Sequence, residues 1–398
     1  MNPERIIDFF SLRRNVAVVS GAGFLLSLGE ELWSRFMPKY LEALGASVFA
    51  IGLFGALKDL LDAVYQYPGG WAADKFGRRN ALVLFSILAL AGYAIYLFAP
   101  SYVFVFIGVF FVMAWSSLAL PATFAIIGDS LPKERRTMGF TVQSILKRVP
   151  IVIAPPVGGF LIVKYGLVEG VKLGLLITIF FTLLAVIIQR RYYVEAPKEN
   201  RIKGNFLEQY AGMNANLKKL LLTDILIRLV EGIPKVFLIL YIINVLGFDA
   251  LQFGSFIALQ MLVSILVYIP VARYADKLGR KPFIALTFVF FALFPLAVVL
   301  AKSFELLVIA FIIAGLRETG EPARKALIVD LTSEETRGRQ VGLYYLIRSF
   351  AVFPASMIGA LLWALSPQLP FYTAFVIGVI GVITFIVTVK EHYLYRTQ

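Results

Sequence analysis

The sequence predicts an all-α membrane protein with twelve transmembrane helices in two pseudo-symmetric six-helix bundles. Three observations predict it: the composition, the number of long apolar segments, and an internal repeat. Of the 398 residues, 59% are hydrophobic and only 16% are charged, whereas a soluble domain is about half apolar and about a quarter charged. A chain this apolar cannot bury its side chains in one water-soluble core, so it must be dissolved in lipid.

The apolar residues form twelve long segments. A hydrocarbon core about 30 Å thick needs roughly 20 apolar residues per helix, and these runs are far longer than a membrane strand. No cleavable signal peptide is expected, because the first run is too long for one. The predicted spans are residues 15–41, 48–72, 80–99, 102–128, 138–163, 168–189, 219–245, 251–272, 283–301, 304–329, 340–365 and 369–389.

Lysine and arginine residues predict the orientation of these segments. They gather at both termini and in the loops after segments 2, 4, 6, 8 and 10, whereas the opposite loops hold only Lys39, Lys164, Lys172 and Lys302. Because cytoplasmic loops carry the excess of basic residues, both termini are predicted in the cytoplasm of a multi-pass plasma-membrane protein. The net charge of +13 then reflects topology and excludes a nucleic-acid partner.

The residue types exclude several kinds of chemistry. The chain has no cysteine and its one histidine, His392, lies in the C-terminal tail, which excludes disulfides, thiolate or multi-histidine metal sites, and a buried histidine proton relay. No nucleophile–base pair, phosphate loop or metal cluster is visible. We therefore expect no enzyme activity, no cofactor and no metal.

The two halves of the chain repeat each other. Asp74 after the second segment recurs as Asp276 after the eighth, and the pattern D-x4-E-x-R begins at both Asp129 and Asp330. A repeat of this size is a common construction of secondary transporters. We expect an N-terminal bundle over residues 1–190, a cytoplasmic linker over 191–218 and a C-terminal bundle over 219–398.

The repeated loop carries a family resemblance. Residues 70–79, Gly-Trp-Ala-Ala-Asp-Lys-Phe-Gly-Arg-Arg, resemble G-x-L-A-D-R-x-G-R-K, the signature loop between helices 2 and 3 of the major facilitator superfamily. The second copy, residues 272–281, begins with Ala where the pattern has Gly. The resemblance implies transport of a small solute by alternating access. It also implies that the first and fourth helices of each half line a central cavity.

The same resemblance implies a latch on the cytoplasmic side. In the superfamily, this loop cluster holds the cytoplasmic side closed in the outward-open state. Independently of the family, the tight connection needs glycines in a left-handed conformation, and each loop arginine can pair with an acid at the end of the fourth span of its half. The predicted gate residues are Asp74, Gly77, Arg78, Asp129, Asp276, Gly279, Arg280 and Asp330.

Charged residues inside the predicted spans are the candidates for function. Each costs about 2.5–3.5 kcal/mol or more at the bilayer centre unless it faces water or a partner. Segments 3, 9 and 12 carry none, and segment 6 carries Glu169 and Lys172 only at its beginning, so we expect these four segments to face lipid. Helical spacing predicts charge stripes on one face, such as Asp224, Arg228, Glu231 and Lys235, and likewise Arg317, Glu321 and Lys325. About half of these groups are expected only to neutralise each other.

The intramembrane acids are the candidates for ion coupling. A carboxylate among apolar walls can bind and release a proton near neutral pH, and sodium remains an alternative coupling ion. The coupling candidates are Glu30, Glu31, Asp59, Asp62, Glu231, Glu318 and Glu321. The substrate-cavity candidates are Trp33, Arg35, Trp115, Lys147, Arg148, Arg228, Arg317 and Arg348.

One further motif bears on the substrate. Residues 154–159, Ala-Pro-Pro-Val-Gly-Gly, resemble the G-P-x-x-G-G motif of drug/proton antiporters of this superfamily but lack its first glycine. The arginine that those antiporters carry early in segment 4 is absent, since residues 107–110 are Ile-Gly-Val-Phe. The prolines and glycines suit a bending or interface helix.

These observations favour a monomeric, proton-coupled multidrug efflux antiporter for amphipathic compounds. Ion-coupled uptake of a small organic anion or metabolite is the alternative, because the intramembrane bases slightly outnumber the acids. A non-transporting membrane sensor is an alternative of another class, although it would not need two matched gate loops. The expected partners are a small-molecule substrate, protons or sodium, and membrane lipid.

Overall fold

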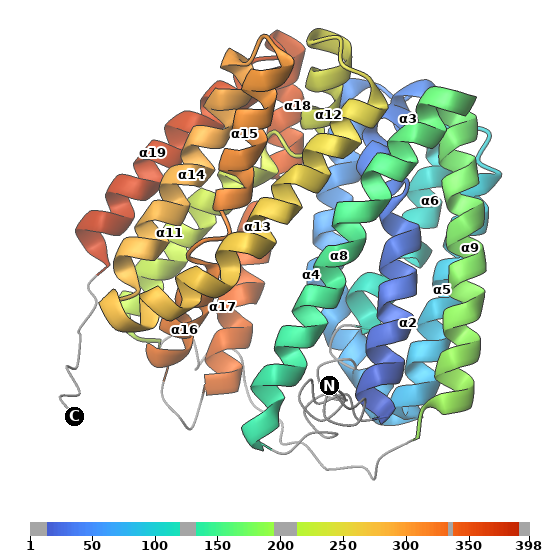
Figure 1. Cartoon of the computed structure of the whole chain (residues 1–398), viewed down its shortest axis with the longest axis horizontal. Helices are drawn as coiled ribbons and strands as arrows, with labels where there is room; N and C mark the ends of the chain where they lie inside the picture. Colours follow the sequence, from blue (N-terminus) through green and yellow to red (C-terminus); the bar gives the residue numbers. More distant parts are fainter. Residues whose placement is uncertain (1–13, 120–132, 195–212, 333–336, 390–398) are drawn as a thin grey trace, which may run out of the picture. The chain divides into compact units, whose positions relative to one another are not determined.

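The structure, a computed structural model, describes residues 14–119, 133–194, 213–332 and 337–389, and these ranges are helical without a strand. The predicted all-α class is confirmed. Labels follow Figure 1. The first elements are α2 (Arg14–Glu31), η1 (Ser34–Phe36), α3 (Met37–Ala43), α4 (Val48–Phe76), α5 (Arg78–Leu97), α6 (Tyr102–Met113), the π-helical turn η2 (Ala114–Leu118), α8 (Lys133–Tyr165) and α9 (Leu167–Tyr192).

The later elements continue in the same way, with several short helices. They are α11 (Ala215–Gly232), α12 (Phe237–Leu240), the π-helical turn η3 (Tyr241–Val245), α13 (Ala250–Leu278), α14 (Lys281–Leu300), α15 (Phe304–Leu316), α16 (Glu321–Asp330), α17 (Arg337–Val352), α18 (Ala355–Leu365) and α19 (Leu369–Thr388).

The predicted count of twelve spans is not confirmed. Within the described residues, eight helical stretches are long and apolar enough to cross a membrane. The other four predicted spans differ for visible reasons. The span over 48–72 carries three charged residues in one short stretch, the one over 102–128 runs beyond the described residues, and those over 219–245 and 304–329 are divided into shorter helices.

The chain forms two compact units. The first holds residues 1–201 with 242–258, and the second holds 202–241 with 259–398. In the first unit, α2 packs against α8 and α9, and α5 packs against α6 and α9 (Figure 1). In the second unit, α14 packs against α15 and α19, and α11 packs against α17 and α19.

Close helix contacts in the first unit depend on glycine. A Cβ on Gly29 of α2 would lie 2.8 Å from the Thr178 Cα of α9, so the two helices touch backbone to backbone. In the proline–glycine motif of α8, a Cβ on Gly158 would collide with the Leu32 carbonyl, and one on Gly159 with the Ala250 carbonyl. The motif therefore lies where α8 contacts other helices, which agrees with the interface role that its prolines and glycines suit.

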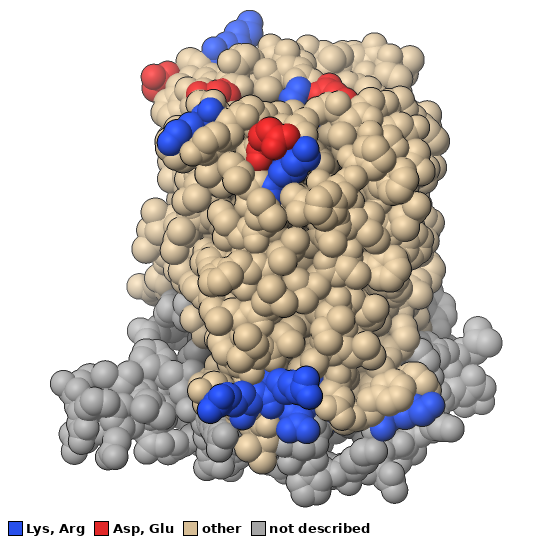
Figure 2. Space-filling model, turned by 90° about the vertical axis from the view of Figure 1, so that its right-hand side faces the viewer, with Lys and Arg blue, Asp and Glu red and all other residues tan. Residues whose placement is uncertain are grey.

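The surface of the first unit has the pattern expected of a membrane protein. Figure 2 views the molecule from the side on which Figure 1 places α9, and a broad band without charged side chains separates two charged zones. The coloured charged side chains at the lower end of this view are all Lys or Arg. On α9 the exposed apolar residues Leu176, Phe180, Leu183 and Ile187 follow helical spacing, which confirms that this helix presents an apolar stripe outward.

The helix breaks fall mainly on the segments that the family resemblance predicts to line a cavity. The first segment breaks at residues 32–33, the fourth contains the π-helical turn η2, the seventh breaks at 233–236, and the tenth breaks at 317–320. A turn also divides the eleventh segment at Phe353-Pro354, as the proline predicts.

Candidate functional site

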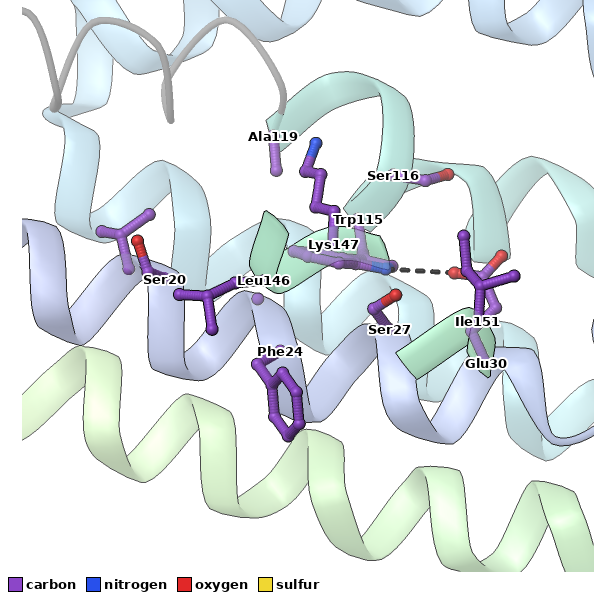
Figure 3. A pocket seen from close by; sticks show the side chains of 12 residues that line it. Ser20, Phe24, Ser27, Glu30, Trp115, Ser116, Ala119, Leu146, Lys147 and Ile151 are labelled. Carbon is purple, nitrogen blue, oxygen red and sulfur yellow. Dashed lines mark hydrogen bonds between the residues drawn. The ribbon is translucent and has the colours of Figure 1, made fainter. Parts of the chain in front are cut away.

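A cavity of about 210 Å³ lies within the first unit, between α2, η2 and α8 (Figure 3). We call it the Glu30 cavity. From α2 its wall takes one helical face, since Ser20, Gly23, Ser27 and Glu30 are three or four residues apart. The full lining is Val19, Ser20, Gly23, Phe24, Ser27, Glu30, Trp115, Ser116, Ala119, Leu146, Lys147 and Ile151.

The π-helical turn η2 positions two hydrogen-bond donors. The Trp115 Nε1–H donates to Glu30 Oε2 on α2 at 3.1 Å, and the Ser117 hydroxyl donates to Asp62 Oδ1 on α4 at 2.6 Å. Figure 3 shows the first of these bonds. π-Helical turns are rare and often lie at functional sites. A Cβ on Gly23 would lie in ordinary van der Waals contact with the indole, 3.6 Å from Trp115 Cη2.

Glu30 and Asp62 are held by neutral donors. Neither carboxylate forms an ion pair with a residue whose side chain the structure describes. Lys58 attracts the Glu30 carboxylate from a longer distance. Its neighbour Glu31 differs, because it forms an ion pair with Arg35 at 2.7 Å.

Lys147 brings a positive charge to the same cavity. Its ammonium forms no ion pair or hydrogen bond with a described side chain, although Asp62 attracts it from beyond ion-pair distance. The Ser20 hydroxyl also lines the cavity and is buried without a hydrogen-bond partner. The cavity therefore combines an apolar wall with unpaired polar groups that a bound molecule could satisfy.

The charged residues of the second unit form one buried network around Asp224. Asp224 accepts hydrogen bonds from Arg324 at 2.6 Å, from the Tyr344 hydroxyl at 3.1 Å and from Arg348 at 3.3 Å. The Asp224 and Arg324 side chains are only 1–2% exposed. We call this group, together with Arg228, Glu231 and Glu321, the Asp224 network.

The remaining acids of this network are also ion-paired. Glu321 binds Arg324 at 2.6 Å and Arg228 at 3.0 Å. Glu231 binds Arg228 at 2.9 Å. Each carboxylate here has an arginine partner, which stabilises its charged form. This is the opposite of the arrangement around Glu30 and Asp62.

The predicted stripe over Arg317, Glu321 and Lys325 is wrong. The helix stops at Leu316 and restarts at Glu321, so Arg317 no longer shares a helical face with Glu321 and Lys325. The Arg317 Nε donates instead to the Ala314 carbonyl at 3.0 Å. Its guanidinium lies 4.9 Å and 4.6 Å from the ring centroids of Phe291 and Phe294.

Several other predicted site residues lie outside the Glu30 cavity. Trp33 is 2% exposed and donates from Nε1 to Thr178 Oγ1 at 3.0 Å, so it is a packing residue and not part of the cavity wall. Arg35 is engaged by Glu31. Arg148 on α8, Asp59 on α4 and Glu318 after α15 are half-buried and do not line this cavity.

The cytoplasmic loops are described in part. Gly77 and Gly279 have φ angles of +86° and +101°, the left-handed conformation that the tight connection was expected to need. Arg280 forms an ion pair with Asp330. The side chains of Asp74 and Asp276 and the whole of Asp129 lie outside the described residues, so the corresponding pair of Arg78 stays a prediction.

Sequence comparison identifies the family. The Major Facilitator Superfamily profile matches residues 19–229 and 220–396, and the chain belongs to this superfamily. It is 24% identical over 383 residues to an uncharacterised MFS-type transporter of Methanocaldococcus jannaschii, covering 93% of this chain and 94% of the relative. It is 24% identical over 377 residues to the multi-drug resistance efflux pump PmrA homolog of Lactococcus lactis, covering 90% of each.

Solved structures share the fold. The crystal structure of a POT family transporter in complex with 5-aminolevulinic acid matches with a TM-score of 0.76 at 14% identity, covering 94% of this chain and 95% of that one. The chain is therefore a multi-pass membrane transporter of small molecules and not an enzyme.

Sequence reasoning missed part of this site. Asp224 and Arg324 were recognised as intramembrane charges but not as site residues, although they form the most buried ion pair of the Asp224 network. Ser20 was not singled out. The periodic spacing of Ser20, Ser27 and Glu30 on one helical face was the available signal.

Proposed function

We propose that this chain exports amphipathic compounds in exchange for protons, by alternating access of its two halves. The observation that carries the proposal is Glu30, a carboxylate at a largely apolar cavity that is bound by a Trp115 N–H and not by an ion pair. Such a carboxylate can gain and lose a proton without breaking a salt bridge, whereas the acids of the Asp224 network would have to leave their arginines. Asp62, bound by Ser117, is the second coupling acid.

The remaining assignments of this proposal come from the sequence. Both termini lie in the cytoplasm of the plasma membrane, the bundles span 1–190 and 219–398, and the chain acts as a monomer. The loop pairs of Arg78 with Asp129 and Arg280 with Asp330 close the cytoplasmic side. The efflux function is supported by the relationship to the Lactococcus lactis pump and by the proline–glycine motif of α8.

Uptake of a small organic anion is the second candidate. Lys147 favours it, because its ammonium lines the same cavity and forms no ion pair with any side chain that the structure describes. The direction of the proton gradient that drives transport separates the two candidates.

Everted vesicles containing the full chain test the proposal. An acid-inside gradient is expected to drive accumulation of a fluorescent amphipathic dye, and nigericin is expected to abolish it. Glu30→Gln is expected to reduce accumulation to the level of vesicles without the protein. Glu169→Gln is the matched control, because Glu169 is an exposed acid paired with Lys172 at 2.9 Å, and it should transport normally. Full accumulation by Glu30→Gln, or by wild type without a gradient, would contradict the proposal.

A further inference from the structure

Two opposite charges line the Glu30 cavity without meeting each other. Glu30 comes from α2 and Lys147 from α8, and no ion pair joins them. In Figure 3 the ammonium of Lys147 does not point toward the Glu30 carboxylate. Glu30 is half-buried and Lys147 is exposed, whereas the charges at the centre of the Asp224 network are buried and paired. The Glu30 cavity therefore presents separate negative and positive positions to whatever enters it.

The neighbouring groups leave both charges available. Glu30 receives one hydrogen bond, from Trp115 at 3.1 Å, and a carboxylate can accept several. Arg35, which could approach Glu30, is paired with Glu31, and Lys58 attracts Glu30 only from a longer distance. Asp62 accepts the Ser117 hydroxyl at 2.6 Å and attracts Lys147 only from beyond ion-pair distance.

The rest of the cavity wall is largely apolar. Phe24, Leu146, Ile151 and the Trp115 indole contribute to it, with the unpaired Ser20 hydroxyl on the same surface. The volume of about 210 Å³ is smaller than the roughly 300–1,000 Å³ of a drug-sized pocket. It suits a compact apolar body, such as one aromatic ring with short charged substituents.

We propose that the Glu30 cavity binds a zwitterionic amphipathic solute. Its ammonium group lies at the Glu30 carboxylate, its acid group lies at the Lys147 ammonium, and its apolar body lies against Trp115. This assignment rests on the proposed transport function and names the substrate class within it. A lipophilic cation would leave Lys147 unpaired, and a simple organic anion would leave Glu30 unpaired.

Three probes with one aromatic body test the charge requirement. Phenylalanine is a zwitterion at neutral pH, its methyl ester is a cation, and N-acetylphenylalanine is an anion. Their affinities for the purified full chain are measured by calorimetry at pH 7. We expect phenylalanine to bind roughly tenfold to a hundredfold more tightly than either derivative, because each derivative loses one charge-assisted hydrogen bond.

Variants assign each preference to one residue. Lys147→Gln is expected to remove the preference for phenylalanine over its methyl ester. Glu30→Gln is expected to remove the preference for phenylalanine over N-acetylphenylalanine. The exchange Glu30→Lys with Lys147→Glu is expected to restore zwitterion binding in the reversed orientation. Lys172→Gln and Glu169→Gln, which alter an exposed ion pair outside the cavity, are the matched controls. The ratio of two ligand affinities measured on the same variant does not depend on how much of that variant is folded, so a partly misfolded variant still tests the preference.

The outcomes separate this inference from the proposed function. If wild type binds phenylalanine and its methyl ester with equal affinity, and Lys147→Gln does the same, the proposal of a zwitterionic substrate is wrong. The cavity would then be a cation site. Absence of phenylalanine binding would overturn the zwitterion proposal as well. In either case, if dye accumulation still depends on the proton gradient and on Glu30, the proposal of proton-coupled export stands. If no such accumulation is observed, the proposed function is wrong.

Discussion

At the residue scale, the intramembrane charges divide into two kinds. The acids of the Asp224 network each have an arginine partner, and Asp224 and Arg324 are almost fully buried. Glu30 and Asp62 have neutral donors instead. A buried ion pair contributes little net stability, but removal of one partner leaves an uncompensated charge. We therefore propose that the first kind maintains the fold and that Glu30 of the second kind serves in ion coupling.

Single and paired substitutions at Asp224 and Arg324 distinguish these roles. Asp224→Asn is expected to destabilise the protein by about 1–3 kcal/mol, because Arg324, Tyr344 and Arg348 lose a charged acceptor while Arg324 keeps Glu321. The double variant Asp224→Leu with Arg324→Met is expected to lose much less stability than the single variant. Thermal unfolding of the detergent-solubilised protein measures both. A double variant that unfolds as early as the single one would show that the pair itself stabilises the fold.

At the element scale, interruptions of the helices direct the side chains of the site. The π-helical turn η2 presents Trp115 to α2 and Ser117 to α4, and the break at 317–320 separates Arg317 from Glu321. Glycine contacts set the position of whole helices. α2 carries Glu30 and lies against α9 through Gly29, so the packing of these two helices places the cavity carboxylate.

Two glycines of α2 provide a matched test of this packing. Gly29→Ala would place a Cβ 2.8 Å from the Thr178 Cα and is expected to cost about 1–3 kcal/mol by overpacking. Gly21→Ala meets nothing within 4 Å and is expected to leave stability unchanged. Thermal unfolding and phenylalanine affinity measure the effect. Equal unfolding temperatures and equal phenylalanine affinities of the two variants would show that α2 can move away from α9 without loss of stability or binding.

At the scale of the whole molecule, the repeat supplies two related halves with one loop each. Alternating access requires contacts that hold in one state and break in the other. We propose that the Arg280–Asp330 ion pair, at the loop of the second half, is such a contact and closes the cytoplasmic side.

Because the chain has no cysteine, one introduced cysteine reports access directly. Asp330→Asn is expected to raise the rate at which a membrane-impermeant thiol reagent on the cytoplasmic side labels Ser27→Cys in the Glu30 cavity. The exchange Arg280→Asp with Asp330→Arg is expected to restore the slow rate. An unchanged labelling rate in Asp330→Asn would remove the latch from the mechanism.

The sequence by itself determined the all-helical class, the membrane environment and the superfamily. A segment that spans lipid must be a long apolar run whose backbone is hydrogen-bonded within the segment. These runs, the repeated loop and its glycines are local features of the chain, so the sequence alone reveals them. Only the tertiary structure decided which charges are paired. Arg324 and Asp224 lie 100 positions apart, and Trp115 and Glu30 lie 85 apart. Spacing along one helix could not reveal these partners, because a helix break or a π-helical turn redirects each side chain toward another element.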